Sequence, residues 1–315
     1  MLGVLSMATW VIVLELRAHS ISEIAHAVTA MPREQLLAGI GLVIPALLAI
    51  ACYDLVAIRA LGIPLAWWRA VGTGLLSYSI TNTTGHSIIV GGLVRLRLYP
   101  RWGVSGIGTT QIIAFGVITY FVGLTTTASL AFLLERGELK GVLEQIPYLG
   151  PALASGWFRT ALPIVLLSAI ASWFLLLVFK RKPLHVAGKT FHLPSFRVGL
   201  FQLVVSCADI FMAASALYVL LPTHNGISWL AFVGIFSVVQ FTALLSAVPG
   251  GIGVFAGLML IVMRPTGADP AALFAALLAF RALYGLIPFA IGGVVFLCFV
   301  RQRPTIEVPA QDIAA

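Results

Sequence analysis

Long apolar segments, separated by short polar ones, run through almost the whole chain. They are 1–16, 35–58, 65–93, 104–134, 157–179, 198–221, 227–263 and 270–300. An α-helix needs about 20 consecutive apolar residues to cross the hydrocarbon core of a bilayer. The pattern therefore predicts an all-α polytopic membrane protein. No small-residue cleavage site follows segment 1–16, so we expect it to be a retained span and not a signal peptide.

Two of these segments are interrupted by glycine pairs. One pair, within Ser87–Leu93, interrupts 65–93, and the other, within Ser246–Ile252, interrupts 227–263. A broken helix leaves backbone N–H and C=O groups unpaired, which lipid does not tolerate, so the breaks face protein, water or a polar ligand. Paired breaks at corresponding places in two halves of a chain point to the substrate site of a transporter.

The interrupted segments permit two topologies. If 65–93 and 227–263 are re-entrant helical hairpins, the chain has six full spans and both termini in the cytoplasm. This topology places twelve Lys and Arg residues inside and six outside, with Arg281 in the bilayer. Eight simple crossings place eleven inside and seven outside, and both termini outside. The positive-inside rule therefore favours the hairpins.

The hairpin topology gives both halves of the chain the same order of elements. Residues 1–134 and 157–300 each read as span, span, hairpin and span, and the two hairpins enter from opposite sides. This is the inverted-repeat plan of many secondary transporters. We expect one transmembrane domain, 1–300, followed by a short cytoplasmic tail, 301–315.

Composition and charge narrow the class of protein further. The chain is 60% apolar and 10% charged, which leaves too few polar residues for the surface of a soluble protein. Its net charge of +8 comes mainly from basic residues between the apolar segments, where they face an anionic leaflet and not nucleic acid. The three cysteines have neither disulfide nor metal-ligand spacing, and the sequence contains no hydrolase or phosphate-loop motif. We expect no cofactor, no bound metal and no enzymatic activity.

Ionisable residues within the predicted spans are the first candidates for function. Asp209 is near the middle of 198–221, and Arg281 is well inside 270–300. A charged side chain at mid-bilayer costs about 2.5–3.5 kcal/mol, so such residues are rarely without a role. The alternative is a structural Asp209–Arg281 ion pair that locks two helices together. Asp54 is a third candidate, because the sequence around it resembles that around Asp209.

A second group of candidates surrounds the first glycine break. The stretch Ser77–Ser87 is rich in hydroxyls and amides, among them Asn82. Such groups bond freed backbone or line a polar path for a head group. Arg95 follows this stretch closely, and the arginine fork suits phosphate oxygens. For Arg97, anchoring at the cytoplasmic leaflet is the simpler interpretation.

Five motifs follow one another along the chain: Tyr53-Asp54, Asn82-x-x-Gly85, Gly91–Tyr99, Pro249–Phe255 and Phe280–Pro288. Together they resemble the transmembrane domain of the lysylphosphatidylglycerol synthase/flippase family (multiple peptide resistance factor). The resemblance implies a flippase of the bacterial inner membrane that moves aminoacylated phosphatidylglycerol to the outer leaflet and so gives resistance to antimicrobial peptides. Full-length members append a cytoplasmic aminoacyl-transferase domain, which agrees with a cytoplasmic C-terminus.

The sequence departs from the family pattern in two ways. The synthase domain is absent, so we expect the standalone form, with any aminoacyl lipid made by a separately encoded synthase. The family's usual glutamate after the Pro-Gly-Gly motif is replaced by Ala256, which predicts a changed head-group preference or reduced activity.

The leading hypothesis is a flippase for phosphatidylglycerol or its aminoacyl ester. Arg95 and Arg281 would hold the lipid phosphate, and Asp54 and Asp209 would hold a cationic head group or balance the arginines. The residues expected to line the head-group path at the hairpin tips are Asn82, Gly250 and Gly251. Two alternatives stay open: a non-transporting membrane partner of a lipid synthase, and an intramembrane lipid-modifying enzyme. The sequence defines neither the oligomeric state nor the driving force.

Overall fold

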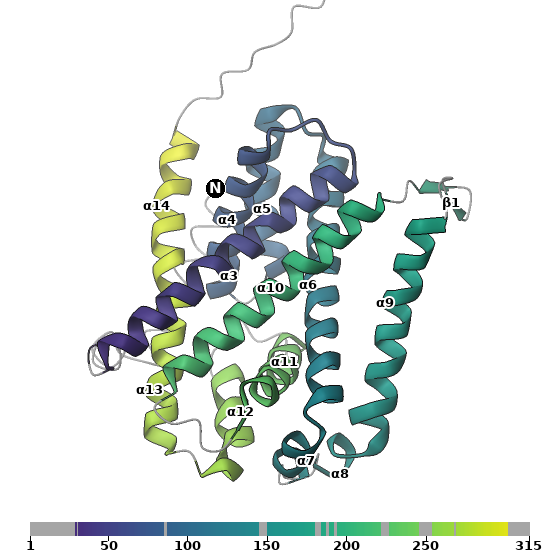
Figure 1. Ribbon diagram of the computed structural model, residues 1–315. Helices are drawn as coiled ribbons and strands as arrows, with labels where there is room; N and C mark the ends of the chain where they lie inside the picture. Colours follow the sequence, from purple (N-terminus) through teal and green to yellow (C-terminus); the bar gives the residue numbers. More distant parts are fainter. Residues whose placement is uncertain are drawn as a thin grey trace, which may run out of the picture.

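A computed structural model of the protein describes residues 29, 31–84, 87–144, 150–179, 184–186, 189–191, 194–221, 227–245, 254–267 and 269–301 (Figure 1). The first half contains α3 (Arg33–Ala60), α4 (Trp67–Thr84), α5 (Ser87–Leu98), η1 (Tyr99–Trp102), α6 (Gly106–Leu134) and α7 (Arg136–Glu144). The second half contains α8 (Gly150–Leu153), η2 (Trp157–Ala161), α9 (Leu162–Phe179), the antiparallel strands β1 (Leu184–Val186) and β2 (Lys189–Phe191), α10 (Phe196–Leu220), α11 (Trp229–Leu245), α12 (Val254–Met263), η4 (Arg264–Thr266), α13 (Pro270–Arg281), η5 (Ala282–Leu286) and α14 (Ile287–Arg301). Apart from the short β-ladder, the regular structure of the described residues is helical, as the sequence predicts.

Five helical segments are long and apolar enough to cross a membrane. They are Arg33–Ala60, Gly106–Leu134, Trp157–Phe179, Phe196–Leu220 and Ala271–Leu297. These segments confirm five of the six predicted full spans. The remaining one, 1–16, lies outside the described residues.

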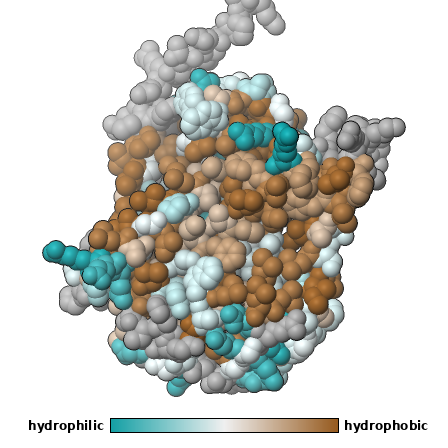
Figure 2. All heavy atoms as spheres, in the orientation of Figure 1, coloured by the Kyte–Doolittle hydropathy of each residue, from teal (hydrophilic) through white to brown (hydrophobic). Residues whose placement is uncertain are grey.

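The surface of the bundle is as apolar as its sequence. Hydrophobic side chains cover most of the middle of the face in Figure 2, whereas hydrophilic ones gather mainly towards its margins. Outermost α9 exposes Leu175, Val178 and Phe179. A contiguous apolar surface of this extent is typical of a protein that contacts lipid.

The two interrupted segments each fold into a pair of shorter helices. α4 packs against α5, and α11 packs against α12. α5 has 12 residues and α12 has 10. At a rise of 1.5 Å per residue they are about 18 and 15 Å long, well short of the ~30 Å hydrocarbon core. Figure 1 shows the two pairs towards opposite ends of the bundle, which agrees with the hairpin topology and not with eight simple crossings.

The central helices of the bundle are α3 and α10, which pack against each other along much of their length. Figure 1 shows them side by side and running in opposite directions. They are the corresponding spans of the two predicted halves, and an inverted repeat relates corresponding helices in this antiparallel way. The antiparallel pair brings the region around Asp54 towards that around Asp209.

Glycines allow neighbouring helices to approach this central pair closely. A Cβ atom at Gly74 of α4 would overlap the backbone oxygen of Ala51 in α3. A Cβ atom at Gly123 of α6 would overlap the backbone oxygen of Ser206 in α10. Small residues at such crossings are the usual means of helix association in membranes, where backbones must approach closely to gain packing energy.

Candidate functional site

Asp54 lies towards the C-terminal end of α3 and is completely buried. Nε of Arg95 donates to its two carboxylate oxygens at 2.9 and 3.1 Å, and Nη2 of Arg95 donates to Oδ1 at 2.7 Å. The hydroxyl of Tyr99 donates to Oδ2 at 2.6 Å. Because Arg95 is on α5 and Tyr99 is on η1, this ion pair ties the first hairpin to α3.

The local sequence of the first hairpin explains this arrangement. Arg95 and Tyr99 are four residues apart, which places both side chains on one face of the helical segment. Gly91 lies one turn earlier, where a Cβ atom would collide with Thr81 and lie 3.1 Å from Nη1 of Arg95. The prediction that the Gly91-Gly92 pair breaks the helix is wrong, because both glycines lie inside α5. Gly91 instead makes room for the buried guanidinium.

Asp209 lies in the middle of α10 and is also completely buried. Its Oδ2 accepts a hydrogen bond from the hydroxyl of Tyr53 at 2.7 Å, and its Oδ1 accepts one from the hydroxyl of Tyr284 at 3.1 Å. Within the described part of the chain, no Lys, Arg or His forms an ion pair with Asp209. Asp209 is thus a buried carboxyl group whose hydrogen-bond partners are neutral.

The second tyrosine at Asp209 comes from an irregular turn. Tyr284 lies in η5, a π-helical turn between α13 and α14. Pro288 follows it by four residues and has no N–H to donate to the carbonyl of Tyr284, so a regular α-helix cannot continue through this point. π-Helical turns of this kind occur frequently at functional sites.

The two aspartate sites are joined into one cluster. Tyr53 and Asp54 are consecutive on α3 but belong to different sites. Tyr53 bonds the carboxylate of Asp209, and Asp54 pairs with Arg95. The ring of Tyr78 from α4 contacts both sites: its centre is 4.6 Å from the guanidinium carbon of Arg95, and it is edge-on to the ring of Tyr53 at 5.6 Å. We define the tyrosine–carboxylate cluster as Tyr53, Asp54, Tyr78, Arg95, Tyr99, Asp209 and Tyr284.

The structure therefore gathers three of the residues singled out from the sequence, Asp54, Arg95 and Asp209. The alternative of a structural Asp209–Arg281 ion pair is not what forms, since the buried ion pair among the described residues joins Arg95 to Asp54. Tyr53 and Tyr284 contact the Asp209 carboxyl group instead. Arg281 is half-buried at the end of α13.

The residues expected at the hairpin tips stay predictions. Asn82 falls in the last turn of α4, with its side chain outside the described part, and Gly250 and Gly251 lie outside the described residues. Ala256 is on α12, partly buried against the largest hydrophobic core. Among the described residues, no group of three or more His, Cys, Asp or Glu side chains could hold a metal ion.

Sequence reasoning did not assign roles to the tyrosines. A signal was present for three of the four, which lie close to a charged residue in the motifs: Tyr53 precedes Asp54, Tyr99 follows Arg95 by one turn, and Tyr284 follows Arg281 by three residues. Tyr78 has no such neighbour in the sequence. A phenol hydroxyl next to an intramembrane charge is a ready hydrogen-bond donor for a buried carboxylate.

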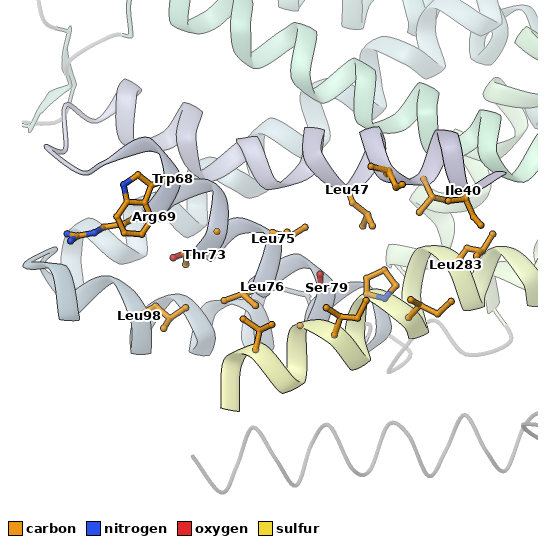
Figure 3. A pocket seen from close by; sticks show the side chains of 18 of the residues that line it. Ile40, Leu47, Trp68, Arg69, Thr73, Leu75, Leu76, Ser79, Leu98 and Leu283 are labelled. Atoms are coloured by element: carbon orange, nitrogen blue, oxygen red, sulfur yellow. The ribbon is translucent and has the colours of Figure 1, made fainter. Parts of the chain in front are cut away.

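A separate cavity of about 600 Å³ lies between α3, α4 and α14 (Figure 3). Figure 3 shows Trp68, Arg69 and Thr73 at one end and Ile40 and Leu283 at the other. Most side chains between these ends are aliphatic. α4 thus contributes both to this cavity and, through Tyr78, to the tyrosine–carboxylate cluster.

Comparison with known proteins places the chain in a family. No family model matches it. The uncharacterized protein slr0712 of Synechocystis is 33% identical over 237 residues, which are 75% of this chain and 70% of that protein. This chain belongs to the slr0712 family.

Two further relatives of this slr0712 family member match more of its length. The inner membrane protein YbhN of Escherichia coli is 27% identical over 278 residues, which are 86% of this chain and 81% of that protein. The phosphatidylglycerol lysyltransferase of Staphylococcus aureus is 24% identical over 282 residues, 85% of this chain but 31% of the lysyltransferase. The relationship therefore covers most of the present helical bundle and only part of the lysyltransferase.

Proposed function

We propose that this member of the slr0712 family is a phospholipid transporter of the bacterial inner membrane, which moves phosphatidylglycerol or its aminoacyl ester between leaflets. The observation that carries the proposal is Asp209, a fully buried carboxyl group in a membrane span whose hydrogen-bond partners are two neutral tyrosines. A charge at this depth costs about 2.5–3.5 kcal/mol, and at Asp54 an arginine offsets it. At Asp209 a transported cation would offset it.

The relatives support the lipid class and the location. By its name, the Staphylococcus aureus relative acts on phosphatidylglycerol, and most of the present chain is similar to a part of it. The Escherichia coli relative is named as an inner membrane protein and matches over most of both chains. A membrane-embedded polar cluster together with these relatives favours transport of a lipid head group over catalysis in water.

The parts of the site divide between binding and support. Asp209 binds the ammonium group of the aminoacyl ester or accepts a hydrogen bond from the glycerol hydroxyls of phosphatidylglycerol, and Tyr53 and Tyr284 orient its carboxylate. Arg281 and the hairpin tips at Asn82, Gly250 and Gly251 line the head-group path, while the acyl chains stay in lipid. The two hairpins give this path an opening towards each leaflet.

Arg95 has a different role in this proposal from the phosphate ligand expected from the sequence. Its side chain is 4% exposed, and two of its guanidinium nitrogens already bond Asp54. A phosphate would have to displace that carboxylate and leave it buried without a partner, which is strongly unfavourable. We assign the Arg95–Asp54 pair to holding the hairpin against α3.

Transport in proteoliposomes tests the proposal. Head-group-labelled phosphatidylglycerol and its lysyl ester would be followed by quenching from outside, with empty liposomes as the reference. The parent protein should move at least one of them, and Asp209→Asn should abolish movement of the lysyl ester, whose ammonium group needs the carboxylate. Glu144→Gln is the matched control, because Glu144 is an exposed carboxylate paired only with exposed Lys140.

The outcomes separate the competing functions. Loss of movement in Asp209→Asn with parent-like movement in Glu144→Gln supports a transporter with its site at Asp209. No movement of either lipid by folded parent protein contradicts the proposal and favours a membrane partner of a lipid synthase. Release of a free amino acid, or hydrolysis of the lipid, would instead favour a lipid-modifying enzyme.

A further inference from the structure

The polar end of the cavity between α3, α4 and α14 is built unlike the rest of it. The guanidinium of Arg69 lies between two indoles, 5.1 Å from the ring centre of Trp68 and 5.5 Å from that of Trp102. The remainder of the lining is almost wholly apolar. A cavity of about 600 Å³ is within the usual range for small-molecule sites, roughly 300–1,000 Å³.

Two polar atoms at this end are buried without a partner. Nε of Arg69 and Oγ1 of Thr73 have no hydrogen-bond partner among the described residues, and Thr73 is 1% exposed. A buried donor left unpaired is destabilising, and more so when the group is charged. The two atoms lie one helical turn apart on α4, so a single ligand with several acceptor oxygens can reach both.

The position of this end fits a lipid head group. Trp67 and Trp68 begin α4 and are 64% and 54% exposed. Tryptophans at helix ends mark the level of the membrane–water interface. From there Thr73, Leu76 and Ser79 follow one face of α4 along the cavity, which ends between Ile40 of α3 and Leu283 of η5. The cavity therefore begins at head-group level and continues along apolar side chains.

We propose that this cavity binds one glycerophospholipid, with its phosphate on Arg69 and Thr73 and one acyl chain along α4 and α14. The guanidinium supplies the opposite charge and a planar donor fork for phosphate oxygens. The aliphatic lining supplies burial for the chain. That the bound lipid is the one on its way to Asp209 rests on the proposed function; the binding itself does not.

Lipid binding is measured on the purified, delipidated full chain in detergent by native mass spectrometry. The probes are phosphatidylglycerol and diacylglycerol with the same acyl chains, and inorganic phosphate serves as a competitor. The parent should bind phosphatidylglycerol about tenfold more tightly than diacylglycerol, because a charged hydrogen-bonded contact is lost with the phosphate. Inorganic phosphate should not displace the lipid, because it lacks the chain.

Matched variants locate the site. Arg69→Gln and Gly72→Leu should each weaken binding of phosphatidylglycerol by about tenfold, the first by removing the cation and the second by filling the cavity. Gly72 lines the cavity, and a Cβ atom there meets nothing within 4 Å, so its replacement keeps the helix packing. The controls are Arg59→Gln, an exposed arginine over the ring of Phe201, and Gly41→Leu, which is equally open but does not line the cavity.

Equal binding of diacylglycerol and phosphatidylglycerol would overturn the proposal, as would parent-like binding by folded Arg69→Gln and Gly72→Leu. Displacement by inorganic phosphate would overturn it in favour of a free-anion site. Binding by the parent without any transport would contradict the proposed function and leave the lipid site intact. Transport with unaltered binding in both variants would contradict the lipid site and leave the function intact.

Discussion

Asp54 and Asp209 lie in the two antiparallel central helices, α3 and α10, yet their surroundings differ in one decisive way. Both carboxyl groups are completely buried, and both accept a hydrogen bond from at least one tyrosine. Asp54 also has the guanidinium of Arg95, whereas no described residue supplies a cation to Asp209. We call Asp54 with Arg95 and Tyr99 the closed site, because its carboxylate is paired with a cation. At Asp209 the carboxyl group has neutral partners, and we call this the open site.

The difference shows what each kind of buried carboxyl group can do. A buried ion pair with its hydrogen bonds filled holds a geometry, because removing either partner leaves an unpaired charge. A buried carboxyl group with only neutral partners keeps its capacity to bind a cation. The ion pair in the first half of the bundle holds its hairpin against α3, and in the proposed function the second half presents the group that binds the substrate.

Removing the closed carboxylate should have the largest effect on stability. Asp54→Asn leaves Arg95 charged in a site where it is 4% exposed, which is expected to lower the free energy of unfolding by about 3–5 kcal/mol. Denaturant titration in detergent micelles measures this change. Glu144→Gln, which breaks only an exposed pair, should leave the midpoint nearly unchanged. Equal stability of Asp54→Asn and the parent would contradict a supporting role for the Asp54–Arg95 ion pair.

Crowding the closed site should have the next largest effect. In Gly91→Ala the new methyl group collides with Thr81 and presses on Arg95, an overpacking expected to lower the free energy of unfolding by about 1–3 kcal/mol. The adjacent Gly92→Ala is the control, because its Cβ atom meets only Ile113, at 3.5 Å. The same titration compares them. An equal loss in both variants would mean that helix flexibility, and not room for the guanidinium, explains the glycines.

Removing a tyrosine hydroxyl group should change the free energy of unfolding less, and the loss should be larger at Asp54 than at Asp209. Tyr99→Phe removes a 2.6 Å hydrogen bond to the paired carboxylate, and we expect about 1.5 kcal/mol less stability. Tyr284→Phe removes a longer bond of 3.1 Å from a half-buried ring, with about 0.5 kcal/mol expected. In proteoliposomes, however, Tyr284→Phe should slow lipid movement and Tyr99→Phe should not. The reverse pattern in transport would exchange the roles of the two halves.

The positions of the five described spans could be predicted from the sequence, because segment length and hydropathy decide whether a helix crosses a bilayer. The two hairpins could also be predicted, but not the position of the first break. The helices α4 and α5 are separated after Thr84, within the polar stretch, whereas Gly91 and Gly92 lie inside α5. Arg281 and Asp209 shared a predicted depth, but depth does not fix which faces of two helices meet. The partners of Asp209 depend on the packing of α3 against α10 and on a π-helical turn, neither of which has a periodic signal.

Arg69 is a second residue whose contacts could not be predicted from the sequence. It is one of the twelve Lys and Arg residues that the hairpin topology places inside, which agrees with its position beside exposed Trp68. Its contact with Trp102, on η1, depends on how the first hairpin folds back. Neighbours in the chain identify an interfacial arginine, and only the tertiary structure shows that its Nε is buried without a partner.

The measurement that tests the central claim most directly compares lipid movement by two folded variants in the same proteoliposomes. One is Asp209→Asn, and the other replaces the closed site as a whole, Asp54→Leu with Arg95→Met and Tyr99→Phe. Replacing a complete buried ion pair by apolar residues of similar volume is often neutral for stability. The account predicts that the triple variant still moves lipid and that Asp209→Asn does not. Parent-like movement by Asp209→Asn, or its loss in a folded triple variant, would contradict it.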